Sequence, residues 1–267
     1  MRNIIIILIL PLLLISAKDS GSDFVFDFSV DDFELDVLGN LYVIHDTELR
    51  KYNSDLKETA NFSDLKYGSI TLVDASDAMN LLVFYEDFAK VLFLDNTLSL
   101  KKSVISLSDL GFPNATLACL SYNNAFWIFD PVNQELVRIT QFLELGDRSG
   151  NLNQIINDEL MPDQLFESGD RVYLKDREKG VFIFDRYGGF IKRLPFINVD
   201  HIYLEDRYNL SYLKNDTLFT YNMQTLTEDT LSFSVPDLKK VAINPQHIYL
   251  LNQKGKLQVF SANKYNK

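Results

Sequence analysis

An internal repeat of about 42 residues constrains the fold of this 267-residue chain more than any other feature. Each copy has a short apolar segment, a polar turn, and a second apolar segment that often ends in Asp or Asn. Six copies can be aligned, and their paired segments are 39–44 with 48–53, 81–85 with 91–95, 125–129 with 136–140, 171–174 with 181–185, 210–213 with 218–222, and 247–251 with 257–261. A period of this length is typical of the blades of β-propellers.

The paired segments have the composition of β-strands. They are short, rich in Val, Ile, Phe and Tyr, and bounded by Asn, Asp, Gly and Ser. Further candidate strands precede or follow the pairs, at 69–73, 116–120, 241–243, 98–105 and 190–195. The pattern therefore predicts an all-β, six-bladed β-propeller with four-stranded blades, formed by residues 23–261 as one domain.

The ends of the repeat region predict how the ring of blades closes. After Ser261 the remaining residues are too few and too polar for a fourth strand in the sixth blade. Ahead of the first blade, residues 23–29 place Phe24, Phe26 and Phe28 on one face of an extended strand. Because an unclosed ring leaves a sheet edge exposed, we expect this N-terminal strand to complete the last blade.

Two of the units resemble a known repeat. Residues 35–43 with 49–52 resemble an NHL repeat, and residues 169–174 with 182–185 are similar, whereas the other four units lack most of the glycines. As architecture, residues 23–261 thus resemble the six-bladed propellers of the NHL and TolB-like group. The resemblance implies a disc with a central channel and a loop-built face for ligands or proteins, and it implies no single activity.

Residues 1–17 have the features of a secretory signal peptide. Arg2 precedes an apolar run from Ile4 to Ile15, and Ser16 and Ala17 are small residues suited to cleavage. The run is shorter than the roughly 20 residues that span a bilayer, so we expect no transmembrane segment in the mature chain. An uncleaved membrane anchor is the alternative. We expect an exported protein, either periplasmic, associated with the outer membrane or extracellular.

The charge balance restricts the partners. The chain has 26 Lys and Arg residues against 37 Asp and Glu residues, a formal net charge of -11. This excess of negative charge disfavours nucleic acids and anionic membrane surfaces. Two Asp-Thr-Leu triplets, at 216–218 and 229–231, resemble the O-glycosylation signal of extracytoplasmic proteins of Bacteroidota. We therefore expect protein partners from the cell envelope.

No set of residues in the sequence predicts catalysis. His45, His201 and His247 fall in different units, so we do not expect them to converge on a metal or a nucleophile. The sequence has no helical metal-binding pair, no Gly-rich phosphate loop and no Ser elbow. We accordingly predict no catalytic residue, and a protein that is not an enzyme is the favoured interpretation.

Four carboxylates recur near the ends of the expected first strands. Asp36, Asp74, Glu167 and Glu205 take similar places in four units, and Cys119 and Asn244 take the corresponding places in the other two. Oxygen ligands around an axis suit calcium, so a channel cation site is one hypothesis. The other is a hydrated acidic channel with no cofactor. No calcium-loop spacing is present.

The connection between Leu143 and Asp163 is longer than the repeat requires. It contains two glycines and a segment in which Ile155 and Leu160 share one face of a short helix. Long ordered connections in compact domains are often functional, although the helix would also fit as a cap on its own blade. We predict partner binding by four of its residues, namely Asp147, Arg148, Ile155 and Leu160.

Three functions remain after this reasoning. The favoured one is a non-catalytic interaction module, an accessory subunit of a cell-envelope or outer-membrane complex. The second is a hydrolase or lyase that acts at the channel mouth and uses the carboxylates to hold a metal. The third is a propeller that binds a small ligand or glycan through exposed aromatic residues such as Tyr85 and Tyr122.

Overall fold

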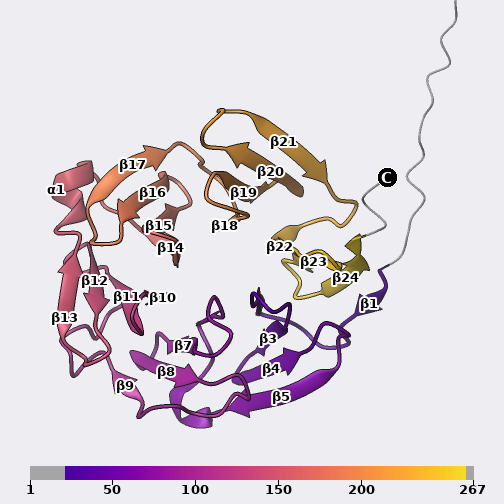
Figure 1. The fold of residues 1–267 in the computed structure, drawn as a ribbon, viewed down its shortest axis with the longest axis horizontal. Helices are drawn as coiled ribbons and strands as arrows, with labels where there is room; N and C mark the ends of the chain where they lie inside the picture. Colours follow the sequence, from indigo (N-terminus) through magenta and orange to yellow (C-terminus); the bar gives the residue numbers. More distant parts are fainter. Residues whose placement is uncertain (1–21, 263–267) are drawn as a thin grey trace, which may run out of the picture.

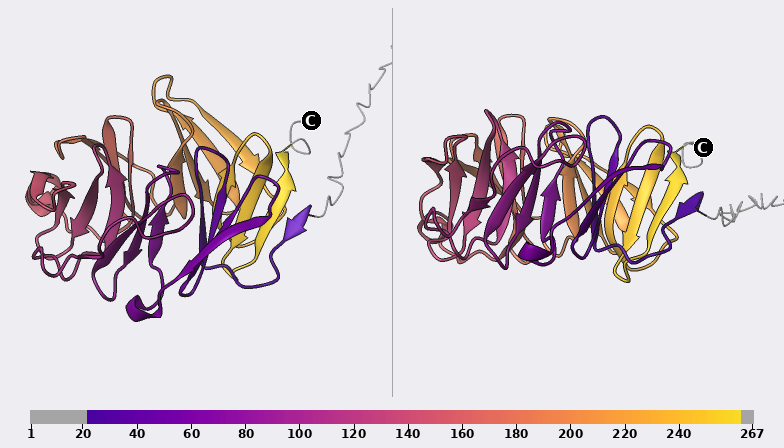
Figure 2. Two further views of the ribbon diagram at one scale, coloured as in Figure 1. Left: turned by 60° about the horizontal axis from the view of Figure 1, so that its bottom comes forward. Right: turned by 90° about the horizontal axis from the view of Figure 1, so that it is seen from below.

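A computed structural model describes residues 22–262, so the leader predicted over residues 1–17 lies outside the described part. Six separate four-stranded sheets surround a central opening (Figure 1). Strands that are neighbours within a blade pair antiparallel. Seen from the side, the blades form a disc (Figure 2). The predicted six-bladed propeller with four-stranded blades is confirmed.

The strands follow the chain blade by blade. Blade 1 consists of β2 (Asp32–Leu35), β3 (Leu41–His45), β4 (Glu48–Tyr52) and β5 (Glu58–Ser63). Blade 2 consists of β6 (Leu72–Asp74), β7 (Leu81–Tyr85), β8 (Lys90–Leu94) and β9 (Ile105–Ser106). Blade 3 consists of β10 (Leu117–Ser121), β11 (Ala125–Asp130), β12 (Glu135–Ile139) and β13 (Leu145–Arg148).

The second half of the ring repeats this order. Blade 4 consists of β14 (Pro162–Ser168), β15 (Arg171–Asp176), β16 (Gly180–Asp185) and β17 (Phe190–Leu194). Blade 5 consists of β18 (His201–Leu204), β19 (Asn209–Lys214), β20 (Thr217–Asn222) and β21 (Glu228–Ser232). Blade 6 consists of β22 (Leu238–Ile243), β23 (His247–Asn252), β24 (Leu257–Ser261) and β1 (Phe24–Val25).

In the described part of the chain, two short helices lie in connections between blades: the 3-10 helix η1 (Leu65–Tyr67) and α1 (Leu152–Ile156). No helix within residues 22–262 combines the length and the apolar character needed to cross a bilayer.

The antiparallel order gives the disc two different faces. The turns from first to second strand and from third to fourth strand lie on one face, which we call the turn face. The turns from second to third strand and the crossings to the next blade lie on the other, which we call the crossover face.

The hydrophobic core lies between the blades rather than in one central mass. The middle strands are apolar on both faces because each blade packs against two neighbours. For example, Phe126 and Ile128 of β11 pack toward blade 2, whereas Trp127 and Phe129 pack toward blade 4. This explains the near-continuous apolar segments that define the sequence repeat.

The N-terminal strand closes the ring, as the sequence predicts. Phe24 and Val25 pair with Val259 and Gln258 of β24, which completes blade 6. Only two residues form this strand. The segment after it continues along blade 6, since the Phe26 amide donates to the Leu257 carbonyl at 3.2 Å.

Two predicted outer segments differ from the structure. The outer strand of blade 2 is only the pair at Ile105–Ser106, whereas residues 98–104 are irregular apart from an isolated bridge between Leu94 and Leu100. In blade 3, the first part of the supposed long connection is the outer strand β13 itself. The unusual length of the 143–163 segment therefore comes partly from a strand whose Leu-Gly-Asp-Arg sequence has no β pattern.

Candidate functional site

The first strands of the blades surround a central channel with a volume of about 1200 Å³. Its lining includes eight acidic residues and three basic ones: Asp32, Glu34, Asp74, Glu86, Glu159, Asp163, Glu167 and Asp200, with Arg177, Lys239 and Lys240. The expected acidic channel is therefore present, but Asp36 and Glu205 are absent from its lining. Two of the four predicted carboxylates, Asp74 and Glu167, line the channel.

The two predicted carboxylates that do line the channel join neighbouring blades. Asp74 accepts the Leu120 amide of blade 3 at 2.7 Å. Glu167 of blade 4 accepts three donors of blade 3: Ser121 Oγ at 2.6 Å, Trp127 Nε1 at 2.8 Å and the Tyr122 amide at 3.3 Å. Both carboxylates at strand ends thus receive hydrogen bonds from a neighbouring blade.

The other two carboxylates act within their own blades. Asp36 accepts the Asn40 amide at 2.8 Å and the Tyr42 hydroxyl at 3.0 Å, which fixes the first turn of blade 1. Glu205 accepts the Ser211 hydroxyl at 2.5 Å in blade 5. The structure therefore does not bring the four carboxylates together. Within residues 22–262 no group of three or more His, Cys, Asp or Glu residues is placed to hold a metal ion.

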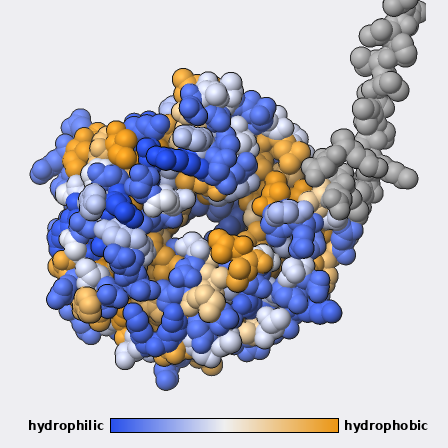
Figure 3. Space-filling model, in the orientation of Figure 1, coloured by the Kyte–Doolittle hydropathy of each residue, from blue (hydrophilic) through white to orange (hydrophobic). Residues whose placement is uncertain are grey.

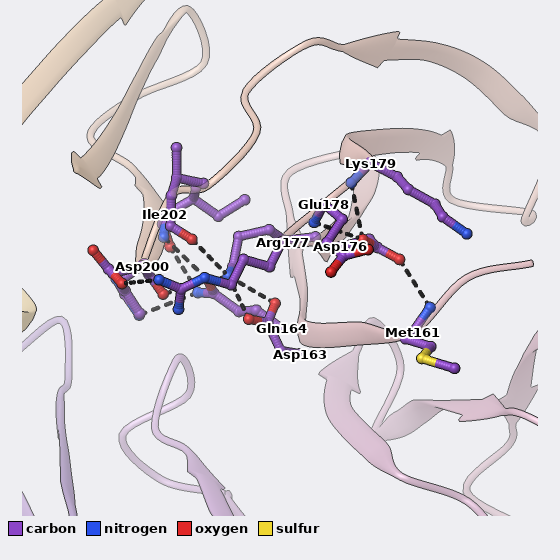
Figure 4. A network of polar contacts seen from close by, with 12 residues as sticks. Met161, Asp163, Gln164, Asp176, Arg177, Glu178, Lys179, Asp200 and Ile202 are labelled. Atoms are coloured by element: carbon purple, nitrogen blue, oxygen red, sulfur yellow. Dashed lines mark hydrogen bonds and ion pairs between the residues drawn. The ribbon is translucent and has the colours of Figure 1, made fainter. Parts of the chain in front are cut away.

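A side-chain amide connects blades 4 and 5 in the channel wall (Figure 4). Gln164 Oε1 accepts the Ile202 amide at 3.0 Å, and Gln164 Nε2 donates to the Ile202 carbonyl at 2.7 Å. On the crossover side of this seam, Arg177 pairs with Asp200 at 2.9 Å. Lys175 is buried and pairs with Asp163 at 2.7 Å. Charges at this seam are thus already paired.

The seam between blades 6 and 1 is an ion-pair cluster. Lys240 is buried, and its Nζ lies 2.5 Å from Glu34 and 3.1 Å from Asp32. Burial raises the pKa of Glu34 to about 7, although Lys240 opposes the shift. The cluster gives the channel a group that titrates near neutral pH, but it also joins the first blade to the last.

The histidines and the cysteine do not form a reactive group. His45, His201 and His247 belong to blades 1, 5 and 6. Burial, together with nearby Lys240, lowers the pKa of His201 well below its usual value, so its imidazole is neutral at pH 7. Cys119 is buried, and burial raises the pKa of its thiol. The buried surroundings of His201 and Cys119 are typical of residues with a structural role.

The structure separates the four residues predicted to bind a partner. Asp147 lies on β13 and pairs with Arg138 at 3.4 Å, facing blade 4. Arg148 pairs with Glu135 at 2.9 Å. Ile155 is 45% exposed on α1. Leu160 is only 1% exposed and belongs to the core between blades 3 and 4, so it cannot contact a partner.

The burial of Leu160 corrects the prediction and has a physical reason. Gln134 holds the backbone of this residue, accepting its amide at 2.7 Å and donating to its carbonyl at 3.0 Å. Leu152, at the start of α1, is fully buried in the same cluster. The helix therefore caps the blade 3–4 core, and a short turn in place of residues 146–161 would remove both a strand and part of that core.

This arrangement predicts opposite effects for the two helix-region residues. Leu160→Ala should lower the free energy of unfolding by about 2–4 kcal/mol because it opens a cavity between blades 3 and 4. Ile155→Ala should change it by less than about 0.5 kcal/mol because the side chain is half exposed. Urea titration followed by Trp127 fluorescence compares the two. Equal effects would contradict the assignment of Leu160 to the core.

A cluster that the sequence did not predict as a group, although it singled out Tyr122 and Asp147, lies on the turn face between blades 3 and 4. Tyr122, in the first turn of blade 3, receives two guanidinium groups against its ring, Arg138 at 3.7 Å and Arg186 at 4.2 Å. Asp147 accepts from the Tyr122 hydroxyl at 3.4 Å, and Tyr187 beside Arg186 is 62% exposed. We call these five residues the blade 3–4 patch.

A glycine lets the two blades approach at this patch. Gly188 has a φ of 86°, and a Cβ atom there would lie 2.8 Å from the Arg148 carbonyl carbon. Any side chain at this position would push the β16–β17 turn away from β13. This close approach of the β16–β17 turn to β13 places the Arg186 guanidinium against the Tyr122 ring. Tyr85, which the ligand-binding hypothesis placed on a face, is instead fully buried.

No known protein-family profile and no curated protein sequence matches this chain. Solved structures do match. A virginiamycin B lyase from Staphylococcus aureus has 9% sequence identity and a TM-score of 0.59, over 85% of this chain and 79% of that chain. The Pan2 WD40 domain of Neurospora crassa has 10% identity and a TM-score of 0.61, over 89% and 77%. BBS1N in complex with ARL6DN has 15% identity and a TM-score of 0.55, over 82% and 74%.

At these identities the similarity establishes the propeller fold alone. The matched structures include an enzyme and a protein bound to another protein, so the fold does not select a function. The resemblance to the NHL and TolB-like group stays a prediction. Function must be argued from the surface of this chain.

Proposed function

We propose that this protein is a non-catalytic, extracytoplasmic propeller that binds other proteins, as an accessory subunit of a cell-envelope or outer-membrane complex. The leader-like residues 1–17 support export. The blade 3–4 patch is the observation that carries the binding role.

The composition of the patch suits a protein partner. Tyr and Arg are the residue types enriched among those that dominate binding energy at protein interfaces. The exposed Tyr187 is accompanied on the same face by Phe142, which is 75% exposed in the third turn of blade 3. None of these residues lines the channel cavity. Side chains projecting from turn tips suit a broad macromolecular surface better than they suit a small ligand.

The channel supports the non-catalytic part of the proposal. Asp74 and Glu167 are occupied by hydrogen bonds from blade 3, and Glu34 is paired with Lys240. A catalytic carboxylate needs an oxygen free to meet its substrate in a suitable geometry. The hydrolase or lyase alternative would require these interactions to break, and breaking them would loosen the seams between blades.

The test is a comparison of complexes isolated from the envelope of the source cells. The double variant Tyr187→Ala with Phe142→Ala should reduce the amount of the co-isolated partner by about tenfold or more, because interface aromatics each carry much of the binding energy. Leu226→Ala is the matched control, since Leu226 is an exposed apolar residue on the same face but in blade 5. Size-exclusion chromatography with quantitative mass spectrometry measures the stoichiometry.

Two results would contradict the proposal. One is that the unmodified protein runs as a monomer in envelope extracts with no stoichiometric partner. The other is that the double variant and the Leu226→Ala control retain equal amounts of partner, which would place binding elsewhere. Melting temperatures close to that of the unmodified protein ensure that each variant is folded.

A further inference from the structure

The outer edge of blade 4 differs from the other outer edges of the disc. Its edge strand β17 has the sequence Phe-Ile-Lys-Arg-Leu and follows the turn that contains Arg186, Tyr187 and Gly188. Phe190 is 37% exposed and Ile191 is 44% exposed. Figure 3 shows apolar residues gathered at the rim over β17.

The backbone of β17 is available on its outer side. The strand is the last in the order of its sheet and pairs only with β16. Among residues 22–262, no backbone hydrogen bond links Phe190–Leu194 to any segment other than β16. Alternate amide and carbonyl groups of an edge strand therefore point away from the sheet and can pair with another strand.

The other outer strands are less suited than β17 to receive an acidic strand. Those of blades 2 and 6 contain only two residues each. In blade 3, Gly188 of the neighbouring blade approaches the end of the outer strand β13 closely. The strands of blades 1 and 5 have the sequences Glu-Thr-Ala-Asn-Phe-Ser and Glu-Asp-Thr-Leu-Ser, which combine polar and acidic residues. Short length and charge are usual protections of an edge, and the two cations of β17 protect it against most strands but not against an acidic one.

The charge of β17 is opposite to that of the protein. The chain has a formal net charge of -11, yet this strand carries Lys192 and Arg193 and no acidic residue. In the described part of the chain, neither cation forms an ion pair. Arg193 lies over the Phe182 ring at 5.5 Å, so its guanidinium is positioned on the face of the strand that also carries Phe190.

We propose that β17 receives an extended, acidic segment of a partner protein as a fifth strand of blade 4. This inference rests on the proposed function, which it deepens by naming the edge and the chemistry of the segment. Main-chain hydrogen bonds supply affinity in such strand addition, and side-chain contacts supply specificity. Acidic residues of the segment meet Lys192 and Arg193, and apolar residues meet Phe190 and Ile191.

A second copy of this chain does not fit the same edge. Two β17 strands carry the same two cations, so pairing them brings like charges together across the new ladder. The acidic remainder of the disc adds further repulsion between copies. An acidic segment from another protein removes both penalties. The adjacent blade 3–4 patch then extends the contact onto the turn face.

A short peptide tests the proposal directly. The probe is acetyl-Thr-Val-Glu-Glu-Val-Val-Thr-amide, which in antiparallel pairing sets its two Glu residues opposite Lys192 and Arg193. Its control replaces the two Glu residues by Lys. We expect the acidic peptide to bind at low ionic strength at least about tenfold more tightly than the control, and salt to weaken the binding. Fluorescence anisotropy of labelled peptides gives both affinities.

Hydrogen exchange identifies the site. Mass spectrometry of the unmodified protein should show outward amides within Phe190–Leu194 exchanging about tenfold or more slowly when the peptide is bound. The double variant Lys192→Glu with Arg193→Glu should no longer bind the acidic peptide. Its matched control is Lys101→Glu with Lys102→Glu, an adjacent pair of cations in blade 2 that gives the same change in net charge.

Distinct outcomes separate this inference from the proposed function. If the acidic peptide fails to bind, or binds without protecting β17, the strand-addition proposal is overturned. If envelope partners co-isolate with the protein but do not slow hydrogen exchange of the β17 amides, the proposed interaction role stands. Only the assignment of the binding site to β17 is then wrong. If the peptide protects β17 but no envelope partner is found, the proposed function fails. Concentration-dependent dimerisation through β17 would replace the acidic partner by a second copy.

Discussion

Deleting residues 23–29 should lower the melting temperature by roughly 10 °C, because about 4 kcal/mol of stabilisation is lost from the closing seam. Phe26 is buried, and its ring lies 5.1 Å from the ring of Tyr52 in blade 1. The segment also supplies amide donors to blade 6, including Phe26 to the Leu257 carbonyl. Removing it exposes the edge of β24, so self-association should increase as well. Differential scanning calorimetry and light scattering measure the two effects.

Single substitutions within this segment provide the control. Phe26→Ala should reproduce a large part of the loss, about 3 kcal/mol, because it empties a buried site. Phe24→Ala should have a smaller effect, since the Phe24 side chain is partly exposed at the edge. A truncated protein that melts within about 2 °C of the intact one would refute ring closure by the N-terminal strand.

Replacing Glu167 by alanine should destabilise the seam between blades 3 and 4 by about 3–5 kcal/mol. Three blade 3 donors lose their acceptor, and two of them belong to Ser121 and Trp127. Trp127 is fully buried and is the only tryptophan in the chain. Chemical unfolding should therefore shift to lower denaturant, and the emission of the native state should move to the red as water reaches the indole.

Glu205→Ala is the matched control for this seam. Glu205 also accepts hydroxyl groups, from Ser211 and Thr220, but it is exposed and acts within blade 5. We expect a loss of less than about 1 kcal/mol for this variant. Similar losses for the two variants would mean that Glu167 does not join blades 3 and 4.

The architecture could be predicted from the sequence because it depends on two patterns that each lie within a short stretch of the chain. Strands buried on both faces produce the apolar segments that recur along the chain, and the Phe24, Phe26 and Phe28 alternation marks an extended closing strand. The outer strands were harder to predict. At β13 the sequence Leu-Gly-Asp-Arg lacks β propensity, and pairing with β12 determines its conformation.

The candidate site was less predictable because it depends on contacts between blades. The positions of Asp74 and Glu167 near strand ends were correct, but their hydrogen-bond donors come from a different repeat. The approach of Arg186 to Tyr122 depends on the conformation of Gly188. Leu160 was placed on the surface because its spacing from Ile155 suggested a shared helix face, whereas α1 ends at Ile156 and Leu160 lies beyond it in the core.

The closing seam also sets the order in which the molecule can be completed. The amide of Ser261 donates to a carboxylate oxygen of Asp23 at 2.6 Å, across a separation of 238 residues. During synthesis residues 23–29 are made before blades 1 to 5, whereas β24, which they must join, is made after them. The segment thus lacks its blade 6 partners while blades 1 to 5 fold, so ring closure is a late, non-local step. Throughout that interval the apolar side chains of this segment and the unpaired edge of the ring are open to aggregation, so folding of this protein is expected to benefit from a chaperone.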